Sequence, residues 1–403
     1  MRRAQAILDQ ISTETGGRRP HYERYALPAV PATIEQLFGA DRPAGLAGEL
    51  GLPPADKVVS FVLDGVGYRR LLALEAAGAV DLSPFGDSLI PLTSVFPPTT
   101  TTALASLATG ASPIVHGVLG YRLFLQQPGA VVNMIKLAAP GGGGDSLERE
   151  GVNPEEFLPV PTVYQRLAEA GVDTVLFLPR YIVGSGLSRI LYQGVAETVA
   201  YVSPADLFFL LQGEMARPGR RLLAVYWPTT DTLAHLYGPR SRPFELELSG
   251  FFRLLAAELL ERVSGAVVLV TADHGFQEID PQQDVIVCPQ HRELKEGLLC
   301  PPVGDNRAAY LFVRRGHEDR VRGFFRRNFP HDFQVLSVDE ALDRKLWGLE
   351  PAGHEARARL GDMVAVARGR KLILWPRDEF KLRGMHGGMT EEELLVPLLT
   401  AVV

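Results

Sequence analysis

The chain has 403 residues and a formal net charge of −6 at pH 7, which excludes the broad basic surface expected of a protein that binds a nucleic acid polymer. Its two cysteines, Cys288 and Cys300, are too few for a disulfide framework, and they lie too far apart to form a zinc-binding pair. No apolar run approaches the ~18 residues of a membrane-spanning helix, and the N-terminal segment lacks the apolar stretch of a secretory signal peptide, so we expect a cytoplasmic protein that contacts no membrane.

Helices and buried strands alternate along most of the chain. Residues 1–56 predict an N-terminal leader of short helices that packs on the core. Continuous apolar runs rich in β-branched residues then predict buried strands, with helical patterns between them. These runs lie at residues 57–63, 172–178, 221–227 and 266–272. The alternation predicts an α/β fold over residues 57–275, with a doubly wound, mostly parallel sheet sandwiched by helices.

The pattern changes after residue 275. A β-α-β unit over residues 308–338 and a hairpin over residues 363–375 predict a small α+β cap, inserted at residues 276–380. Residues 381–403 then predict a return to the core, with a helical turn and a final buried strand.

Acidic residues and histidines follow three of the predicted strands. They are Asp64, Asp231, His235, Asp273 and His274. Because ligands bind outside the carboxyl ends of the strands in open α/β sheets, we expect these side chains to converge on one rim. His386, which lies among glycines before the final strand, is positioned to return to the same rim. Carboxylate oxygens and imidazole nitrogens suit zinc, or manganese with more oxygen ligands.

Four threonines, Thr99 to Thr102, follow Pro97 and Pro98 and precede a short apolar helix. The prolines favour extended backbone before them, so the helix is expected to begin at about Thr99 or Thr100. A hydroxyl at a helix N-terminus lies near free backbone N–H groups that bind anions. Beside a divalent metal ion such a hydroxyl becomes an activated nucleophile. Thr102, one turn further on, is expected to place its hydroxyl near a carbonyl of its own helix.

The ordered motifs resemble the alkaline phosphatase superfamily, and more closely its type I phosphodiesterase/nucleotide pyrophosphatase branch. They are Asp64, a threonine before a helix, Asp-x-x-x-His at 231–235, Asp-His at 273–274 and His-Gly at 386–387. The similarity runs over residues 57–275 and 384–403. It implies two divalent metal ions, most simply zinc with manganese as the alternative. Asp64, Asp273, His274 and the nucleophile would hold one ion, and Asp231, His235 and His386 the other.

The resemblance also selects a nucleophile. In the family pattern the reactive threonine stands ten residues before the glycine that ends the helix, here Gly110, which selects Thr100, with Thr99 as the main rival. Thr100 would attack phosphorus and form a phosphothreonine intermediate. The backbone N–H of Thr101, together with Arg122 and Arg307, would bind anionic groups of the substrate.

The expected function is therefore metal-dependent hydrolysis of a small phosphorylated substrate, such as a nucleotide or a phosphodiester. A diester or pyrophosphate is favoured because the nucleophile is a threonine, while Arg122 keeps a monoester open. Three other functions also stay open. They are a phosphomonoesterase or sulfatase of the same superfamily, a phosphoryl transferase or mutase, and a non-catalytic binding module.

Overall fold

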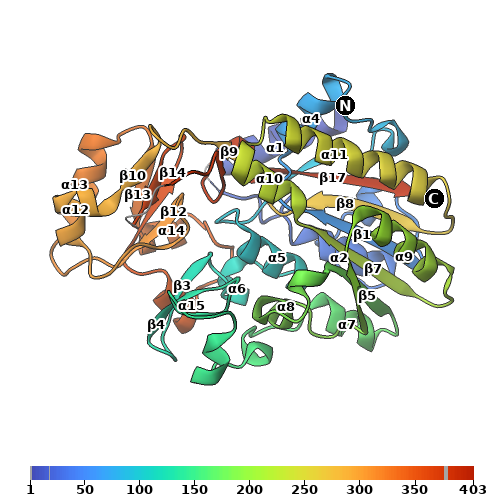
Figure 1. Cartoon of the computed structure of the whole chain (residues 1–403), viewed down its shortest axis with the longest axis horizontal. Helices are drawn as coiled ribbons and strands as arrows, with labels where there is room; N and C mark the ends of the chain where they lie inside the picture. Colours follow the sequence, from blue (N-terminus) through green and yellow to red (C-terminus); the bar gives the residue numbers. More distant parts are fainter. Residues whose placement is uncertain (1, 18, 376–379) are drawn as a thin grey trace.

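Two β-sheets lie side by side in the computed structural model, which describes residues 2–17, 19–375 and 380–403 (Figure 1). The larger sheet has seven strands in the order β2-β17-β8-β1-β7-β5-β6. The strands are β2 (Ile90–Thr93), β17 (Leu395–Val402), β8 (Val267–Ala272), β1 (Lys57–Leu63), β7 (Arg221–Trp227), β5 (Asp173–Pro179) and β6 (Glu197–Tyr201). The five strands from β8 to β6 are parallel to one another, and β17 runs antiparallel between β2 and β8. The predicted mostly parallel α/β sheet is therefore confirmed.

Helices cover both faces of this sheet because its central strands are apolar on both sides. Phe61 of β1 stacks against Phe208 of α9 (Pro204–Ala216) and meets Phe251 of α11 (Arg242–Leu255) edge to face. Its neighbour Val62 instead lines a small cavity with Leu104 of α5 (Thr100–Thr109) and side chains of α2 (Ala29–Leu37) and α7 (Val163–Glu169). Successive residues of a strand point to opposite faces, so these contacts define a helix layer on each side.

The smaller sheet has six strands in the order β13-β14-β12-β11-β3-β4. They are β13 (Phe333–Ser337), β14 (Met363–Ala367), β12 (Ala308–Leu311), β11 (Val303–Gly304), β3 (Arg122–Leu125) and β4 (Ala130–Asn133). Helices α12 (Arg292–Gly297) and α13 (Glu318–Asn328) pack with its strands through a separate apolar cluster. Four of the strands come from the predicted cap. The β3–β4 hairpin comes from the stretch 57–275, so the smaller sheet extends beyond the insertion predicted at 276–380.

The hairpin predicted over residues 363–375 does not form. β14 pairs with β12 and β13, whereas β15 (Leu372–Leu374) pairs in parallel with β10 (Val285–Val287). The intervening backbone is held by Arg307, which donates hydrogen bonds to the carbonyls of Gly369, Arg370 and Lys371. These hydrogen bonds anchor the backbone that connects β14 with β15. Residues 376–379, at the end of the predicted cap, lie outside the described residues.

Candidate active site

The carboxyl rim of the larger sheet carries the predicted acidic and histidine residues. Asp64 follows β1 directly, and Asp273 and His274 follow the adjacent strand β8. Asp231 and His235 lie on α10 (Thr229–Tyr237), which begins after β7, the neighbour of β1 on its other side. His386 follows β16 (Gly384–Met385), a short strand that pairs with β9 (Gln277–Glu278) beyond β8. Parallel strand ends thus account for most of the convergence.

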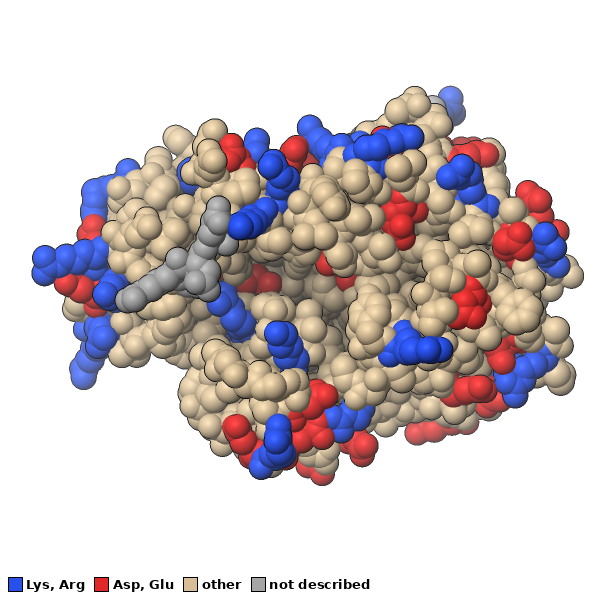
Figure 2. Space-filling model, in the orientation of Figure 1, with Lys and Arg blue, Asp and Glu red and all other residues tan. Residues whose placement is uncertain are grey.

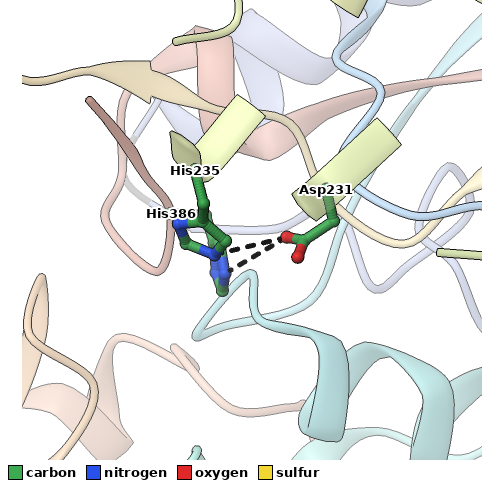
Figure 3. A group of neighbouring side chains, drawn as sticks. All are labelled: Asp231, His235 and His386. Atoms are coloured by element: carbon green, nitrogen blue, oxygen red, sulfur yellow. Dashed lines mark ion pairs between the residues drawn. The ribbon is translucent and has the colours of Figure 1, made fainter. Parts of the chain in front are cut away.

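Asp231, His235 and His386 form the first of two possible metal-binding groups (Figure 3). Both imidazole rings point toward the carboxylate of Asp231, with His235 Nε2 3.4 Å and His386 Nε2 3.8 Å from its Oδ1. The ligand atoms of the three side chains lie within 4.8 Å of one another. This grouping has the composition expected of a site for zinc.

Asp64, Asp231 and His274 form the second group, again with ligand atoms within 4.8 Å of one another. His274 Nε2 lies 3.3 Å from Asp64 Oδ1 and 3.5 Å from Asp273 Oδ2. Asp231 belongs to both groups, and the rings of His274 and His386 stack with their centroids 3.8 Å apart. The two groups are therefore adjacent, as two neighbouring ions require.

Hydrogen bonds to backbone carbonyls orient all three imidazole rings. His235, His274 and His386 donate from Nδ1 to the carbonyls of Gly384, Gly275 and Pro98, at 2.8, 3.1 and 3.3 Å. A carbonyl oxygen only accepts, so each Nδ1 carries the proton. Each Nε2 consequently faces the carboxylates, which is the arrangement that outer hydrogen bonds give to metal-binding histidines.

Three buried carboxylate oxygens have no hydrogen-bond donor within the described part of the chain: Asp64 Oδ1, Asp231 Oδ1 and Asp273 Oδ2. Burial, followed by repulsion from Asp273 and Asp231, raises the pKa of Asp64 well above its usual range. Burial also raises the pKa of Asp231. Buried carboxylate oxygens that accept no hydrogen bond are costly. These oxygens and the three Nε2 atoms therefore fit divalent cations, which would compensate both the desolvation and the repulsion.

The hydroxyl groups of Thr99 and Thr100 point to different partners. Helix α5 begins at Thr100, whose Oγ1 lies 3.1 Å from His274 Nε2. Thr99 precedes the helix with extended backbone, and its hydroxyl donates to Asp305 Oδ1 at 3.0 Å. The geometry thus favours Thr100 over Thr99 as the residue whose hydroxyl meets the metal-binding groups.

The expectation for the hydroxyl of Thr102 is wrong. Thr101 and Thr102 are fully buried, and neither hydroxyl has a hydrogen-bond partner among the described residues. Neither hydroxyl therefore donates to a backbone carbonyl of the described residues, and both side chains lie within a helix that is buried along its length. The predicted role of Thr101 rests on its backbone N–H, which is unaffected by this.

Arg122 opens strand β3 and is partly buried. Its Nη2 donates to Asn306 Oδ1 at 2.9 Å, and its buried Nε has no partner in the part of the chain that the structure describes. Burial lowers the pKa of this guanidinium, opposed by the nearby Asp305. The Nε–H group thus has no acceptor among the described residues, and the binding of an anion by Arg122 stays a prediction.

Arg307 does not have the predicted role, because its side chain is fully buried and fully used. Nε and Nη2 donate to Glu393 at 2.6 and 2.8 Å, and Nη1 and Nη2 donate to three backbone carbonyls at 2.7–2.9 Å. All five N–H groups of the guanidinium are thereby occupied. Arg307 is a structural residue and is not available to bind a substrate.

Two tyrosines near the rim were not predicted from the sequence. Tyr226 of β7 donates a hydrogen bond to Asp64 Oδ2, so it helps to orient that carboxylate. Tyr181 is 76% exposed, and its pKa is raised by partial burial and by the negative charges of Asp64 and Asp231. Tyr226 lies in the apolar run 221–227 that predicts a strand, and Tyr181 follows the predicted strand 172–178, so neither position signals a polar role for the hydroxyl.

A cavity of about 360 Å³ adjoins the start of α10. Its lining includes Tyr181, Tyr201, Val202, Pro204, Trp227 and Thr229. The cavity therefore offers mainly aromatic and apolar surface at the ends of β5, β6 and β7.

The space between the two sheets is hollowed on the face that Figure 2 shows. Acidic side chains lie deep in this hollow, and Lys and Arg side chains lie around its edges (Figure 2). A basic edge favours the approach of anionic ligands.

None of the helices in the described residues is long and apolar enough to cross a membrane. The cytoplasmic location stays a prediction.

The fold and the site define an α/β protein of the alkaline phosphatase-like class. A model of the family "Type I phosphodiesterase / nucleotide pyrophosphatase" matches residues 58–388. The chain belongs to this family of metal-dependent phosphoester hydrolases, as the resemblance of its motifs implied.

Solved structures with the same fold include two classes of hydrolase. Murine ectonucleotide pyrophosphatase/phosphodiesterase 5, an inactive variant in complex with AMP, is 19% identical with a TM-score of 0.64, over 85% of this chain and 87% of that chain. The human protein is 17% identical with a TM-score of 0.63, over 86% and 88%. Phosphonoacetate hydrolase from Sinorhizobium meliloti 1021, in complex with phosphonoformate, is 22% identical with a TM-score of 0.60, over 86% and 90%.

Proposed function

We propose that this protein hydrolyses phosphodiester or pyrophosphate bonds in small nucleotide-like substrates, with Thr100 as the nucleophile. One observation carries the proposal: the Thr100 hydroxyl lies 3.1 Å from His274 Nε2, at a helix N-terminus that faces unpartnered carboxylate oxygens of the described chain. A hydroxyl beside metal ligands and free helix amides has the surroundings of an activated nucleophile.

Two divalent ions, zinc or alternatively manganese, would be held by the two groups of ligands. Asp64, Asp273, His274 and Thr100 would hold one, and Asp231, His235 and His386 the other. When bound, such ions supply positive charge that activates the attacking oxygen and stabilises the leaving oxygen. Because Asp231 lies within reach of both groups, its carboxylate is suited to keep the two ions close together.

Thr100 would form a covalent intermediate. Its Oγ1 attacks phosphorus, the bond from phosphorus to the leaving oxygen breaks, and the hydroxyl proton is transferred in the net reaction to that leaving group. Water then attacks the phosphothreonine, releases the second product and restores the Thr100 hydroxyl. The N–H groups at the start of α5 would bind a non-bridging oxygen during both steps.

Two further features bear on the substrate. Arg122, with its unpartnered Nε in the described region, is suited to a second anionic group. The cavity lined by Tyr181 and Trp227 is suited to an aromatic group such as a nucleobase. The AMP bound in the murine protein of the same fold supports a nucleotide, and the phosphonoformate bound in the bacterial hydrolase supports a small dianion.

A comparison of substrates tests the proposal. Zinc-loaded protein is expected to hydrolyse bis-p-nitrophenyl phosphate faster than p-nitrophenyl phosphate, and exhaustive chelation is expected to abolish both activities until zinc or manganese is restored. Faster turnover of the monoester would indicate a phosphomonoesterase, and transfer to an added alcohol would indicate a transferase. Absence of turnover on a panel of diesters, pyrophosphates, monoesters and sulfate esters would leave a binding module.

A further inference from the structure

The N-terminus of α5 lacks the side-chain cap that a threonine at this position commonly provides, among the described residues. A threonine before a helix ordinarily accepts a hydrogen bond from the N–H of the second or third helical residue. Thr99 has the backbone conformation of such a cap, with φ −141° and ψ 148°, yet among the described residues its side chain caps no helix amide. Its hydroxyl instead donates to Asp305 Oδ1 at 3.0 Å.

The diverted hydroxyl affects the amides beside the nucleophile. A cap from Thr99 would occupy the N–H of Thr101 or Thr102, the second and third residues of the helix. The next amide, that of Ala103, is already bonded to the carbonyl of Thr99 at 2.9 Å. The amides of Thr101 and Thr102 are therefore the ones that Thr99 leaves to an anion placed at Thr100.

Burial, a second hydrogen bond and a close glycine hold the Asp305 carboxylate beside the Thr99 hydroxyl. It is 6% exposed, and its second oxygen accepts the backbone N–H of Tyr121 at 3.2 Å. A Cβ added to Gly387, beside the predicted ligand His386, would lie 3.1 Å from the Asp305 Cβ. An ionised carboxylate only accepts hydrogen bonds, so the Thr99 hydroxyl must direct its proton toward Asp305.

We propose that Asp305 is a positioning residue: it draws the Thr99 hydroxyl away from the helix end and so keeps the first amides of α5 open for a phosphoryl oxygen of the substrate. This inference rests on the proposed function, because the anion is the phosphoryl group that Thr100 attacks. Without the acceptor, the Thr99 hydroxyl can rotate to cap the helix, and the phosphoryl oxygen must then displace it.

A double-mutant cycle tests this role, with inorganic phosphate as the probe and calorimetry on the zinc-loaded full chain as the readout. Asp305→Ala is expected to weaken phosphate binding about tenfold, which is the size expected for competition with an N-cap. Thr99→Val has no hydroxyl with which to cap the helix, so Asp305→Ala is expected to change phosphate binding less than about twofold in that background. Zinc content is expected to stay the same in all four proteins.

Two further variants keep the result interpretable. Asp305→Asn retains one acceptor, so it gives an intermediate loss and replaces the alanine variant if that protein does not fold. Asp284→Asn is the matched control, because Asp284 is also buried and also accepts a backbone N–H, from Asp280, but lies between β9 and β10. This control is expected to bind phosphate as the wild type does.

An equal tenfold loss in both backgrounds would overturn the proposal, since Asp305 would then act through Tyr121 or through charge. The absence of any loss in Asp305→Ala would overturn it as well. If the wild-type protein neither binds phosphate nor hydrolyses phosphoesters, the proposed function itself fails. This outcome differs from equal losses in both backgrounds of an enzyme that is active, which would refute only the role of Asp305.

Discussion

Two of the buried clusters of charged side chains in the described residues differ in how completely their polar atoms are hydrogen-bonded. In the first, Arg307 uses all five N–H groups, and Glu393 accepts from Arg307, Gly388 and Thr390. In the second, formed by Asp64, Asp231 and Asp273, three carboxylate oxygens have no donor in the described part of the molecule.

This difference separates a structural cluster from a functional one. A buried ion pair with every hydrogen bond made needs no further partner, and its removal affects stability. Buried carboxylates that repel one another persist only where something else compensates their charge, and such groups concentrate at functional sites. The paired cluster anchors the turn after His386 through Gly388, and the unpaired cluster is open to ligands.

The largest expected effect follows from removing the nucleophile beside the unpaired cluster. Thr100→Ala is expected to lower kcat by at least ~10⁴-fold, as loss of a nucleophile does in other covalent mechanisms, while both metal ions still bind. Thr100→Ser should retain partial activity. Thr109→Ala, at the far end of the same buried helix, serves as the control. A Thr100→Ala protein with wild-type turnover would remove Thr100 from the mechanism.

Breaking the paired cluster is expected to change stability and leave the chemistry in place. Arg307→Met leaves the Glu393 carboxylate buried without its main partner, so the free energy of unfolding should fall by about 3–5 kcal/mol. Denaturant unfolding of the chelated protein measures this change. If Arg307 bound substrate, the folded variant would instead show a selective rise in KM with unchanged stability.

Removing one ligand of the first metal-binding group should separate the two ions. His386→Ala is expected to reduce the zinc content from two ions to one and to lower activity by on the order of a hundredfold or more, since even changes outside the first layer of ligands cost ~10–100-fold. Metal analysis after dialysis gives the stoichiometry. Retention of two tightly bound ions would exclude His386 as a ligand.

The smallest effect concerns the repulsion within the unpaired cluster. Burial raises the pKa of Asp64 in the folded chain, so without metal the stability falls as pH rises from the unfolded pKa through the folded one. Above that range, Asp64→Asn should make the chelated protein more stable by about 1–2 kcal/mol. Added zinc should reverse this order, because the wild type gains more from binding. Thermal unfolding at pH 7.5, with and without zinc, measures the stability difference between the variant and the wild type in each condition. An Asp64→Asn protein that is less stable than the wild type both with and without zinc would contradict the account.

The larger sheet and the residues at its rim could be predicted because the apolar runs and the residues that directly follow them are local features of the sequence. The runs 57–63 and 221–227 are mainly apolar and coincide with β1 and β7. Acidic residues and histidines directly after such strands converge whenever the strands are parallel neighbours. The position of Thr100 at the start of α5 follows from the two prolines before it and from Gly110, which ends the helix in the left-handed conformation with φ 72°.

The paired cluster could not be predicted, because its contacts join distant parts of the chain. Arg307 directly precedes strand β12, a position that usually faces solvent, and its partner Glu393 lies 86 residues further on. Likewise, nothing in the local sequence indicates that the β3–β4 hairpin joins the smaller sheet. The alternation of buried and partly exposed residues in β3 does not specify which sheet the strand pairs with. Asp305 was missed for the same reason, since Thr99 lies 206 residues away.

The most direct test of the central claim is to locate the phosphorylated residue in a trapped intermediate. Zinc-loaded protein can be quenched in acid during turnover of bis-p-nitrophenyl phosphate, digested and analysed by mass spectrometry. We predict a phosphoryl adduct on Thr100, and its loss in Thr100→Ala. An adduct on Thr99, or rapid turnover with no adduct on any threonine of residues 99–102, would contradict the assignment of Thr100 as the nucleophile.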